Sequence, residues 1–222
     1  MFLEQLINGI TLGSIYAIVA LGYTLVFGVL DIINMAHGEI FMFGAFVGML
    51  IVSKAGAPLP LAFLGAIVVT AAMGLLLERF ALRPLRGRPG ASHLASLIST
   101  IGVSILLENV AHKIFGSGNH LFETPFAEIR FEVGPVTIYL VQVVILLISL
   151  LLMAGLALWL SRTRTGKALR ATAENLETAG LLGVDTNRMI TATVVIASAM
   201  GGVAWVLVGM AFNYINNQIG LS

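Results

Sequence analysis

Long stretches without charge constrain the fold of this chain more than any other feature. A helix needs roughly 20 apolar residues to span a bilayer. Four stretches have this length and character: residues 6–29, 61–77, 136–160 and 190–212. Of the 222 residues, 58% are hydrophobic and only 10% are charged, whereas soluble domains carry about 25% charged residues. The sequence therefore predicts an integral membrane protein.

Two further stretches complete a bundle but depart from a simple span. Residues 94–110 are shorter and more polar, which predicts a helix packed inside the bundle rather than against lipid. Residues 40–52 are too short to cross unless the helix begins near Ile32 and takes in several polar residues. We expect an all-α polytopic bundle of about six membrane segments, one broken or re-entrant, with an added cytoplasmic helix.

Small residues recur at four-residue spacing in several of these stretches. The rows are Gly9, Gly13 and Ala17; Gly44 and Gly48; Ala66, Thr70 and Gly74; and Ala197 and Gly201. Such rows let helix backbones approach closely inside lipid. They predict a tightly packed bundle and carry no information about a substrate.

The distribution of charge predicts the orientation, because short loops rich in Lys and Arg stay in the cytoplasm. One loop contains four arginines: Arg79, Arg83, Arg86 and Arg88. A second cationic segment is 161–188. The segment between them, 113–134, is richer in glutamate and suits the opposite side: Glu123, Glu128 and Glu132. Residues 213–222 are then expected outside. Met1 lies outside if residues 32–52 cross the membrane, and inside if they are re-entrant.

A polar cluster interrupts the apolar sequence between residues 31 and 39. It contains Asp31, Asn34, His37 and Glu39. An ionisable residue at membrane depth is costly and indicates a functional site by default. On a helix, Asn34 and His37 would share a face. Two interpretations stay open: Asn34, His37 and Glu39 line a substrate path or gate, or these groups sit at the membrane boundary and bond a helix end.

The polar insert at 161–188 has the pattern of a short amphipathic helix over 167–182. Apolar or small residues repeat along it: Leu169, Ala173, Leu176, Ala179 and Gly183. Gly183 is well placed to end the helix. Such a helix either lies on the lipid surface or inserts its apolar face into a partner. Small residues such as Ala173 and Ala179 favour insertion into a partner.

Several chemistries find no support in the sequence. The chain contains no cysteine, which excludes disulfides and thiolate metal sites. Gly166-Lys167 is followed by alanine and lacks the earlier glycine of a P-loop, so nucleotide hydrolysis by that route is excluded. There is no H-E-x-x-H or G-x-S-x-G motif, and we expect no metal site or catalytic residue. The cations form no aromatic-interleaved face, which argues against nucleic-acid binding.

Several segments together resemble one family. Residues 177–183 are similar to the coupling-loop pattern E-A-A-x-x-x-G of bacterial ABC importer permeases, with threonine in place of the first alanine. Residues 8–17, 22–28, 33–45 and 166–185 resemble the LivH-type permease of high-affinity branched-chain amino-acid importers. The resemblance covers essentially the whole chain as a single transmembrane permease domain, with the coupling loop at about 161–189.

The resemblance implies a multi-pass permease subunit in the bacterial inner membrane that moves leucine, isoleucine and valine. It implies as partners a second homologous permease, two cytoplasmic ATPases that bind the ATP, and a periplasmic substrate-binding protein, with no cofactor in this chain. It also implies a set of ATPase-coupling residues: Arg170, Glu174, Glu177, Ala179 and Gly183.

Permeases of this family usually continue with more helices past a position like Gly220, so we expect the usual C-terminal helices to be lacking here. Two alternatives stay open at this point. The substrate of a related permease could be urea, an amide or another amino acid. The polar break at 34–39 also suits a secondary transporter or channel that works without an ATPase.

Overall fold

The computed structural model describes residues 2–86, 93–116, 118–122, 124, 126, 128–133 and 136–215. Its helices are α1 (Phe2–Leu30), α2 (His37–Met49), α3 (Leu59–Leu77), α4 (His93–Phe115), α5 (Leu140–Arg162), α6 (Arg164–Glu174), α7 (Leu176–Leu181) and α8 (Thr186–Phe212). Two π-helical turns, η1 (Leu50–Lys54) and η2 (Glu78–Leu82), extend α2 and α3. The short strands are β1 (His120–Leu121), β2 (Arg130–Val133), β3 (Val136–Tyr139) and β4 (Tyr214–Ile215).

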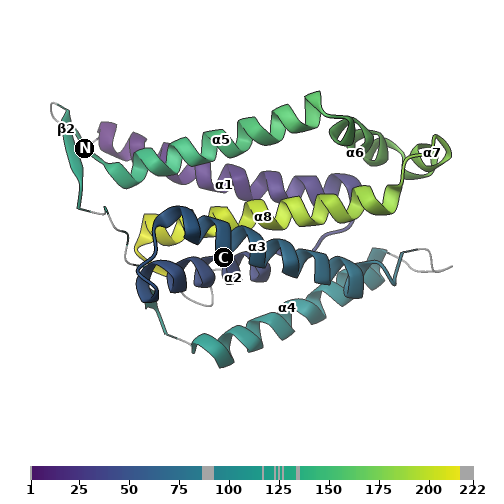
Figure 1. The fold of residues 1–222 in the computed structure, drawn as a ribbon, viewed down its shortest axis with the longest axis horizontal. Helices are drawn as coiled ribbons and strands as arrows, with labels where there is room; N and C mark the ends of the chain where they lie inside the picture. The colour runs from purple at the N-terminus through teal and green to yellow at the C-terminus, as the bar shows by residue number, and fades with distance from the viewer. Residues whose placement is uncertain are drawn as a thin grey trace.

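The predicted polytopic all-α bundle is confirmed. Among the described residues, 6 helices are long and apolar enough to cross a membrane. They lie side by side along one axis (Figure 1), which lets every backbone group bond within its own helix. The segment that the sequence left ambiguous is α2 with η1, an 18-residue span that starts at His37.

Helix α8 forms the centre of the bundle. It packs against α1, α2 and α3, and most of its residues are buried, from Ile190 to Met210. Helix α2 is the second interior element, with both its polar and apolar residues buried. Helix α5 covers α1 and the outer part of α8. The two most buried spans, α8 and α2, therefore pack directly against each other.

The crossing of α2 over α8 depends on glycine. A Cβ built on Gly44 would lie 2.7 Å from the Cα of Gly202, closer than carbon atoms pack. A Cβ on Gly201 would overlap the ring of Phe41. The predicted close packing is thus present at these positions. At Gly9 and Gly13 a Cβ would meet nothing within 4 Å, so that row makes no close contact in the described part of the chain.

The prediction of an interior helix at 94–110 is wrong. Helix α4 lies at the edge of the bundle, where it contacts α2 and η2, and among its described residues only Ser96, Thr100 and Ala111 are buried. Some of its polar groups bond carbonyls of the same helix. The Thr100 hydroxyl donates to the carbonyl of Leu97 at 3.0 Å, and the Asn109 amide donates to that of Ile105 at 2.7 Å.

The two cationic segments lie at the same end of the molecule. The C-terminal end of α3 and the helices α6 and α7 are close to one another along the bundle axis (Figure 1). The positive-inside rule places this end in the cytoplasm. Helix α1 begins at the opposite, outer end, as expected for six crossings. Arg88 and Glu123, which the charge argument used, lie outside the described residues.

Strands cap the outer end. Strand β1 pairs antiparallel with β4, and β2 pairs antiparallel with β3. The prediction of a helix from residue 136 is therefore wrong by one turn, because residues 136–139 pair with 130–133 and α5 begins only at Leu140. The β-branched residues Val136, Thr137 and Ile138 favour this strand.

An ion pair is buried at the inner end of α3. The guanidinium of Arg86 donates to the carboxylate of Glu78, whose side chain is 2% exposed. Burial lowers the pKa of Arg86, and the neighbouring Glu78 carboxylate opposes this shift. Arg86→Met leaves that carboxylate unpaired, so we expect a loss of about 3–5 kcal/mol in the free energy of unfolding. Denaturant unfolding in detergent micelles measures this change.

The matched control for this prediction removes both charges. The double variant Glu78→Gln with Arg86→Met should recover most of the lost stability, since no uncompensated charge remains. Equal losses in the single and the double variant would show that Arg86 contributes through packing rather than through charge.

Candidate functional site

The polar cluster forms the start of α2. Residues 31–36 are not helical, and Asn34 forms a turn just before the helix. Its side-chain oxygen accepts from the amide of Ala36 at 3.2 Å, its carbonyl accepts from the amide of His37 at 3.3 Å, and Ala36 is the N-cap residue of α2. The expectation that Asn34 and His37 share one helical face is therefore wrong, because an Asn that bonds the local backbone favours a turn over a helix interior.

His37 lies in the middle of an aromatic row. Its ring meets Tyr23 of α1 and Phe41 of α2 edge-on, with centroids 4.7 Å and 4.1 Å apart, and Phe41 in turn meets Trp205 of α8 at 6.3 Å. His37 is fully buried, and both ring nitrogens lack a hydrogen-bond partner. The indole nitrogen of Trp205 is also buried without one. Buried polar atoms are normally paired, so this row is chemically unusual.

The structure brings Asn34 and His37 together but places Glu39 elsewhere. Asn34 and His37 both line a cavity of about 200 Å³ next to the inner half of α1. Glu39 is buried on the other side of α2, where it bonds Ser104 of α4 and lies near Glu108. The spacing explains this separation, because residues two apart on a helix point in opposite directions.

The cytoplasmic insert consists of two helices rather than the single helix predicted over 167–182. Asn175 interrupts it in an extended conformation, with φ −157° and ψ 107°. Its side-chain oxygen accepts from the amide of Thr178 at 2.8 Å and so starts α7. Asparagine is a strong N-cap, which outweighs the continuity of the apolar stripe. Gly183, at φ 86°, ends the insert as expected.

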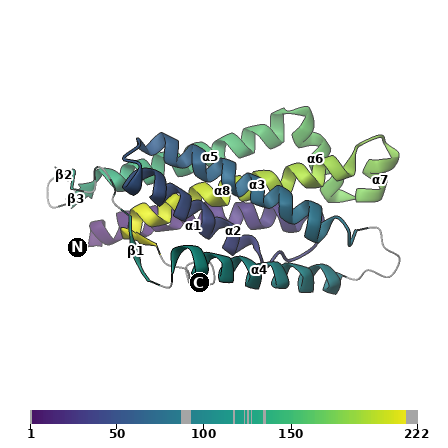
Figure 2. The ribbon, with the colours of Figure 1, turned by 60° about the horizontal axis from the view of Figure 1, so that its bottom comes forward.

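The insert exposes some predicted coupling residues and hides another. Arg170, Glu174, Glu177 and Gly183 are exposed, whereas Ala179 is buried. Sequence reasoning missed the most exposed apolar side chains of the insert, Leu181 at 83% and Leu182 at 78%. Helix α7, which Leu181 ends, lies at the inner end of the bundle (Figure 2). A leucine pair directly before the helix-ending glycine is the signal that could have revealed them.

The first helix of the insert is fixed to α5. The Thr163 hydroxyl donates to the carbonyl of Trp159 at 2.7 Å and accepts from the amide of Gly166 at 2.9 Å. A Cβ on Gly166 would lie 2.5 Å from the Trp159 carbonyl oxygen and 2.6 Å from the Cα of Leu160. Helix α6 can therefore approach the last turn of α5 only because residue 166 is glycine.

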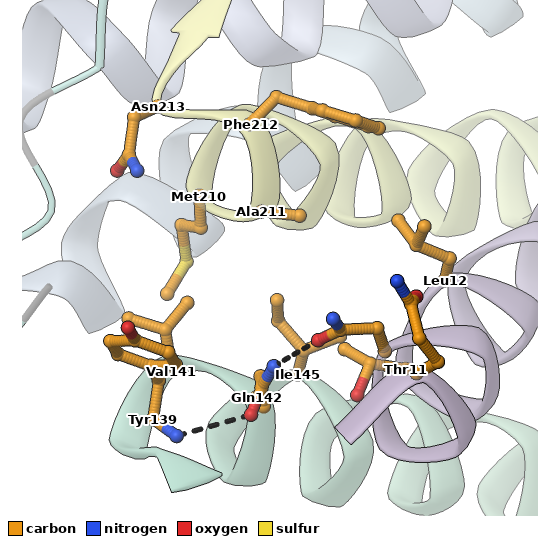
Figure 3. A pocket seen from close by; sticks show the side chains of 12 residues that line it. Thr11, Leu12, Tyr139, Val141, Gln142, Ile145, Met210, Ala211, Phe212 and Asn213 are labelled. Atoms are coloured by element: carbon orange, nitrogen blue, oxygen red, sulfur yellow. Dashed lines mark hydrogen bonds between the residues drawn. The ribbon is translucent and has the colours of Figure 1, made fainter. Parts of the chain in front are cut away.

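A cavity of about 600 Å³ opens at the outer end between α1, α5 and α8 (Figure 3). Gln142 bridges two walls: its side-chain nitrogen donates to Asn8 at 2.5 Å, and its oxygen accepts from the amide of Tyr139 at 3.1 Å. Buried Thr11, Val141 and Ile145 line the cavity as well. No sequence argument assembled this site, although Asn8 and Gln142 are polar residues in otherwise apolar spans.

The described residues contain no group of three or more His, Asp or Glu side chains that could hold a metal ion. The molecule thus has three candidate functional features: the aromatic row, the outer cavity and the protruding α6–α7 insert.

Comparison with known proteins gives one consistent picture. Residues 5–222 match the family described as "Branched-chain amino acid transport system / permease component". The chain is 41% identical to the high-affinity branched-chain amino acid transport system permease protein BraD of Pseudomonas aeruginosa, over 99% of this chain and 74% of that protein. It is equally similar to the permease protein LivH of Escherichia coli, with the same coverage.

A more distant relative is the probable branched-chain amino acid transport permease protein LivH of Methanocaldococcus jannaschii, which is 28% identical over 89% of this chain and 63% of that protein. No solved structure matches this chain. The match to the family extends over the bundle and the insert alike. The chain therefore belongs to the family of permease components of branched-chain amino acid transport systems.

Proposed function

We propose that this chain is a permease subunit of an ABC importer for leucine, isoleucine and valine in the bacterial inner membrane. The observation that carries the proposal is the 41% identity, over 99% of the chain, to relatives named as permeases of such systems. Its six spanning helices and cytoplasmic insert support the same role, within a single permease domain whose coupling loop is about 161–189.

The ATPase activity in this proposal belongs to partner chains. Two cytoplasmic ATPases bind the ATP and contact the exposed side of the insert, which carries Arg170, Glu174 and Glu177. Leu181 and Leu182 supply the apolar anchor that an interface needs at its centre. Ala179 and Gly183 act indirectly, one by packing α7 onto the bundle and the other by ending it.

The remaining partners are a second permease and a periplasmic binding protein. The second permease pairs with this bundle of six spanning helices in the membrane. The binding protein docks at the outer end, where the cavity of about 600 Å³ lies. Asn34 and His37 belong to the path or its gate, whereas Glu39 supports the contact between α2 and α4.

Uptake into membrane vesicles tests the proposal. Vesicles with this chain, a second permease, both ATPases and the binding protein should accumulate labelled leucine only when ATP and the binding protein are present. Excess isoleucine and valine should compete, and urea or acetamide should not. Accumulation of urea instead of leucine would assign another substrate, and leucine flux driven by an ion gradient through this chain alone would assign a secondary transporter.

The apolar tip of α7 yields a prediction for coupling. Leu181→Asp combined with Leu182→Asp removes the anchor without touching the bundle, since both side chains are more than three-quarters exposed. Truncated interface anchors commonly cost about 2 kcal/mol or more, so we expect at least roughly tenfold weaker association of the ATPase. Co-purification and uptake both measure this loss.

Asn187→Asp is the control for added negative charge: it places one carboxylate, where the leucine variant places two, on an exposed residue at the same end of the bundle. It should leave uptake and thermal stability unchanged. If the leucine variants bind the ATPase as tightly as the parent chain, the anchor lies elsewhere on the insert, and Glu177→Ala then tests the charged side.

A further inference from the structure

Three cavities follow one another along one side of α1. The outer one, of about 600 Å³, and a second of about 160 Å³ share Leu12 and Phe212 in their walls. The third, of about 200 Å³, lies against the inner half of α1 and is lined by Tyr23, Phe27 and residues 32–34. Together they extend from the outer end of the helix to its inner end.

One row of residues on a single face of α1 passes through all three cavities, and other lining residues of α1 lie on either side of this row. Residues Gln5, Leu12, Tyr16, Tyr23 and Phe27 line the three cavities. They are separated by seven, four, seven and four positions, which keeps them on one side of an α-helix. Helix α8 contributes the facing residues in the same order, with Phe212 at the outer cavity and Trp205 at the second.

The aromatic row separates the second cavity from the third. Trp205 lines the second cavity, Tyr23 and His37 line the third, and Phe41 connects the two through ring contacts. The nitrogens of His37 and Trp205 are buried in this closure without partners. Polar atoms that lack partners in a closed state can bond a passing solute once the rings separate.

The walls indicate the class of solute. No Asp, Glu, Lys or Arg is among the described residues that line the three cavities. A solute with net charge would lose its hydration on entering these cavities and would find no counter-ion there. Such a solute would therefore be rejected. Side-chain amides stand at both ends, Asn8 and Gln142 outside and Asn34 inside, and apolar side chains lie between them.

We propose that the transport route runs along this face of α1, with the row of Tyr23, His37, Phe41 and Trp205 as its gate, and that it takes net-neutral solutes with an apolar body. Naming the solute as a branched-chain amino acid rests on the proposed function. The position of the route rests on the cavities and the unpartnered nitrogens alone.

The absence of cysteine makes the route directly testable by single-cysteine labelling. Leu12→Cys should react with a charged, membrane-impermeant thiol reagent added outside, and Phe27→Cys should react only when the reagent is inside. Ile10→Cys is the matched control for Leu12→Cys, because Ile10 lies at the same depth on the opposite face of α1 and is 52% exposed. Leu76→Cys, exposed on α3, controls for Phe27→Cys.

The gate is tested by adding His37→Ala or Trp205→Ala to the Phe27→Cys chain. Either change should let the outside reagent reach residue 27, so that sidedness is lost, and two independent variants guard against one that fails to fold. Equal labelling of Ile10→Cys and Leu12→Cys would overturn the route. Correct sidedness in vesicles that import no leucine would retain the route and overturn the proposed function.

Discussion

Gly44→Ala is expected to lower the free energy of unfolding by about 1–3 kcal/mol, the usual cost of overpacking a tight core. The added methyl carbon would sit 2.7 Å from the Cα of Gly202, which is backbone and cannot rotate away. The two most buried helices would have to separate, and contacts along their whole crossing would weaken. Thermal unfolding in detergent and the yield of folded protein measure the effect.

Two other glycines make this prediction specific. Gly48→Ala meets the Cγ2 of Val206 at 2.8 Å, and because a side chain can adjust we expect a smaller loss. Gly155→Ala, on the exposed side of α5, meets nothing within 4 Å and should be neutral or slightly stabilising. If all three variants melt alike, close packing of α2 on α8 does not limit stability.

Gly166→Ala should abolish uptake while the spanning helices stay folded. The new Cβ would collide with backbone atoms of Trp159 and Leu160, so α6 must move away from the end of α5. On the proposed function, α6 connects the bundle to α7, which contacts the ATPase, so displacement of α6 should uncouple ATP hydrolysis from transport. We expect uptake to fall by at least about tenfold, as misplacement of roughly 1 Å does in assembled active sites.

Comparison of ATP hydrolysis with uptake in the same vesicles measures this uncoupling. Gly180→Ala is the control in the neighbouring helix, because its Cβ would lie 3.9 Å from the nearest atom of Thr186, an ordinary contact. The Gly166→Ala bundle should melt near the parent temperature. Normal uptake by Gly166→Ala would mean that α6 tolerates a shift and that α7 transmits movement through α8 instead.

The bundle could be predicted from the sequence because membrane spans depend on local composition. Charge-free length identifies a span whatever its neighbours are, and four of the six were located in this way. The predictions that failed depend on hydrogen-bond partners, which composition alone does not identify. Residues 136–139 look like the start of a span until β2 pairs with them, and α4 looks interior until its hydroxyls bond nearby carbonyls.

The candidate sites were predictable in part for the same reason. The polar cluster stood out because charge is rare in this chain. Which side of α2 each member faces depends on where the helix begins, and the turn at Asn34 precedes that start. The break at Asn175 could have been predicted, because asparagine is a strong N-cap residue and here it interrupts an apolar stripe. The outer cavity joins α1, α5 and α8, which no local pattern connects.

The attachment of α7 has a consequence for how such transporters diversify. Asn175 and Gly183 delimit it through their own backbone geometry, and among its residues only Ala179 is buried. Its outward residues can therefore change without disturbing the membrane bundle. If α7 contacts the ATPase as proposed, substitutions confined to residues 176–182 are enough for a duplicated permease to acquire a different ATPase, while the rest of the chain stays unaltered.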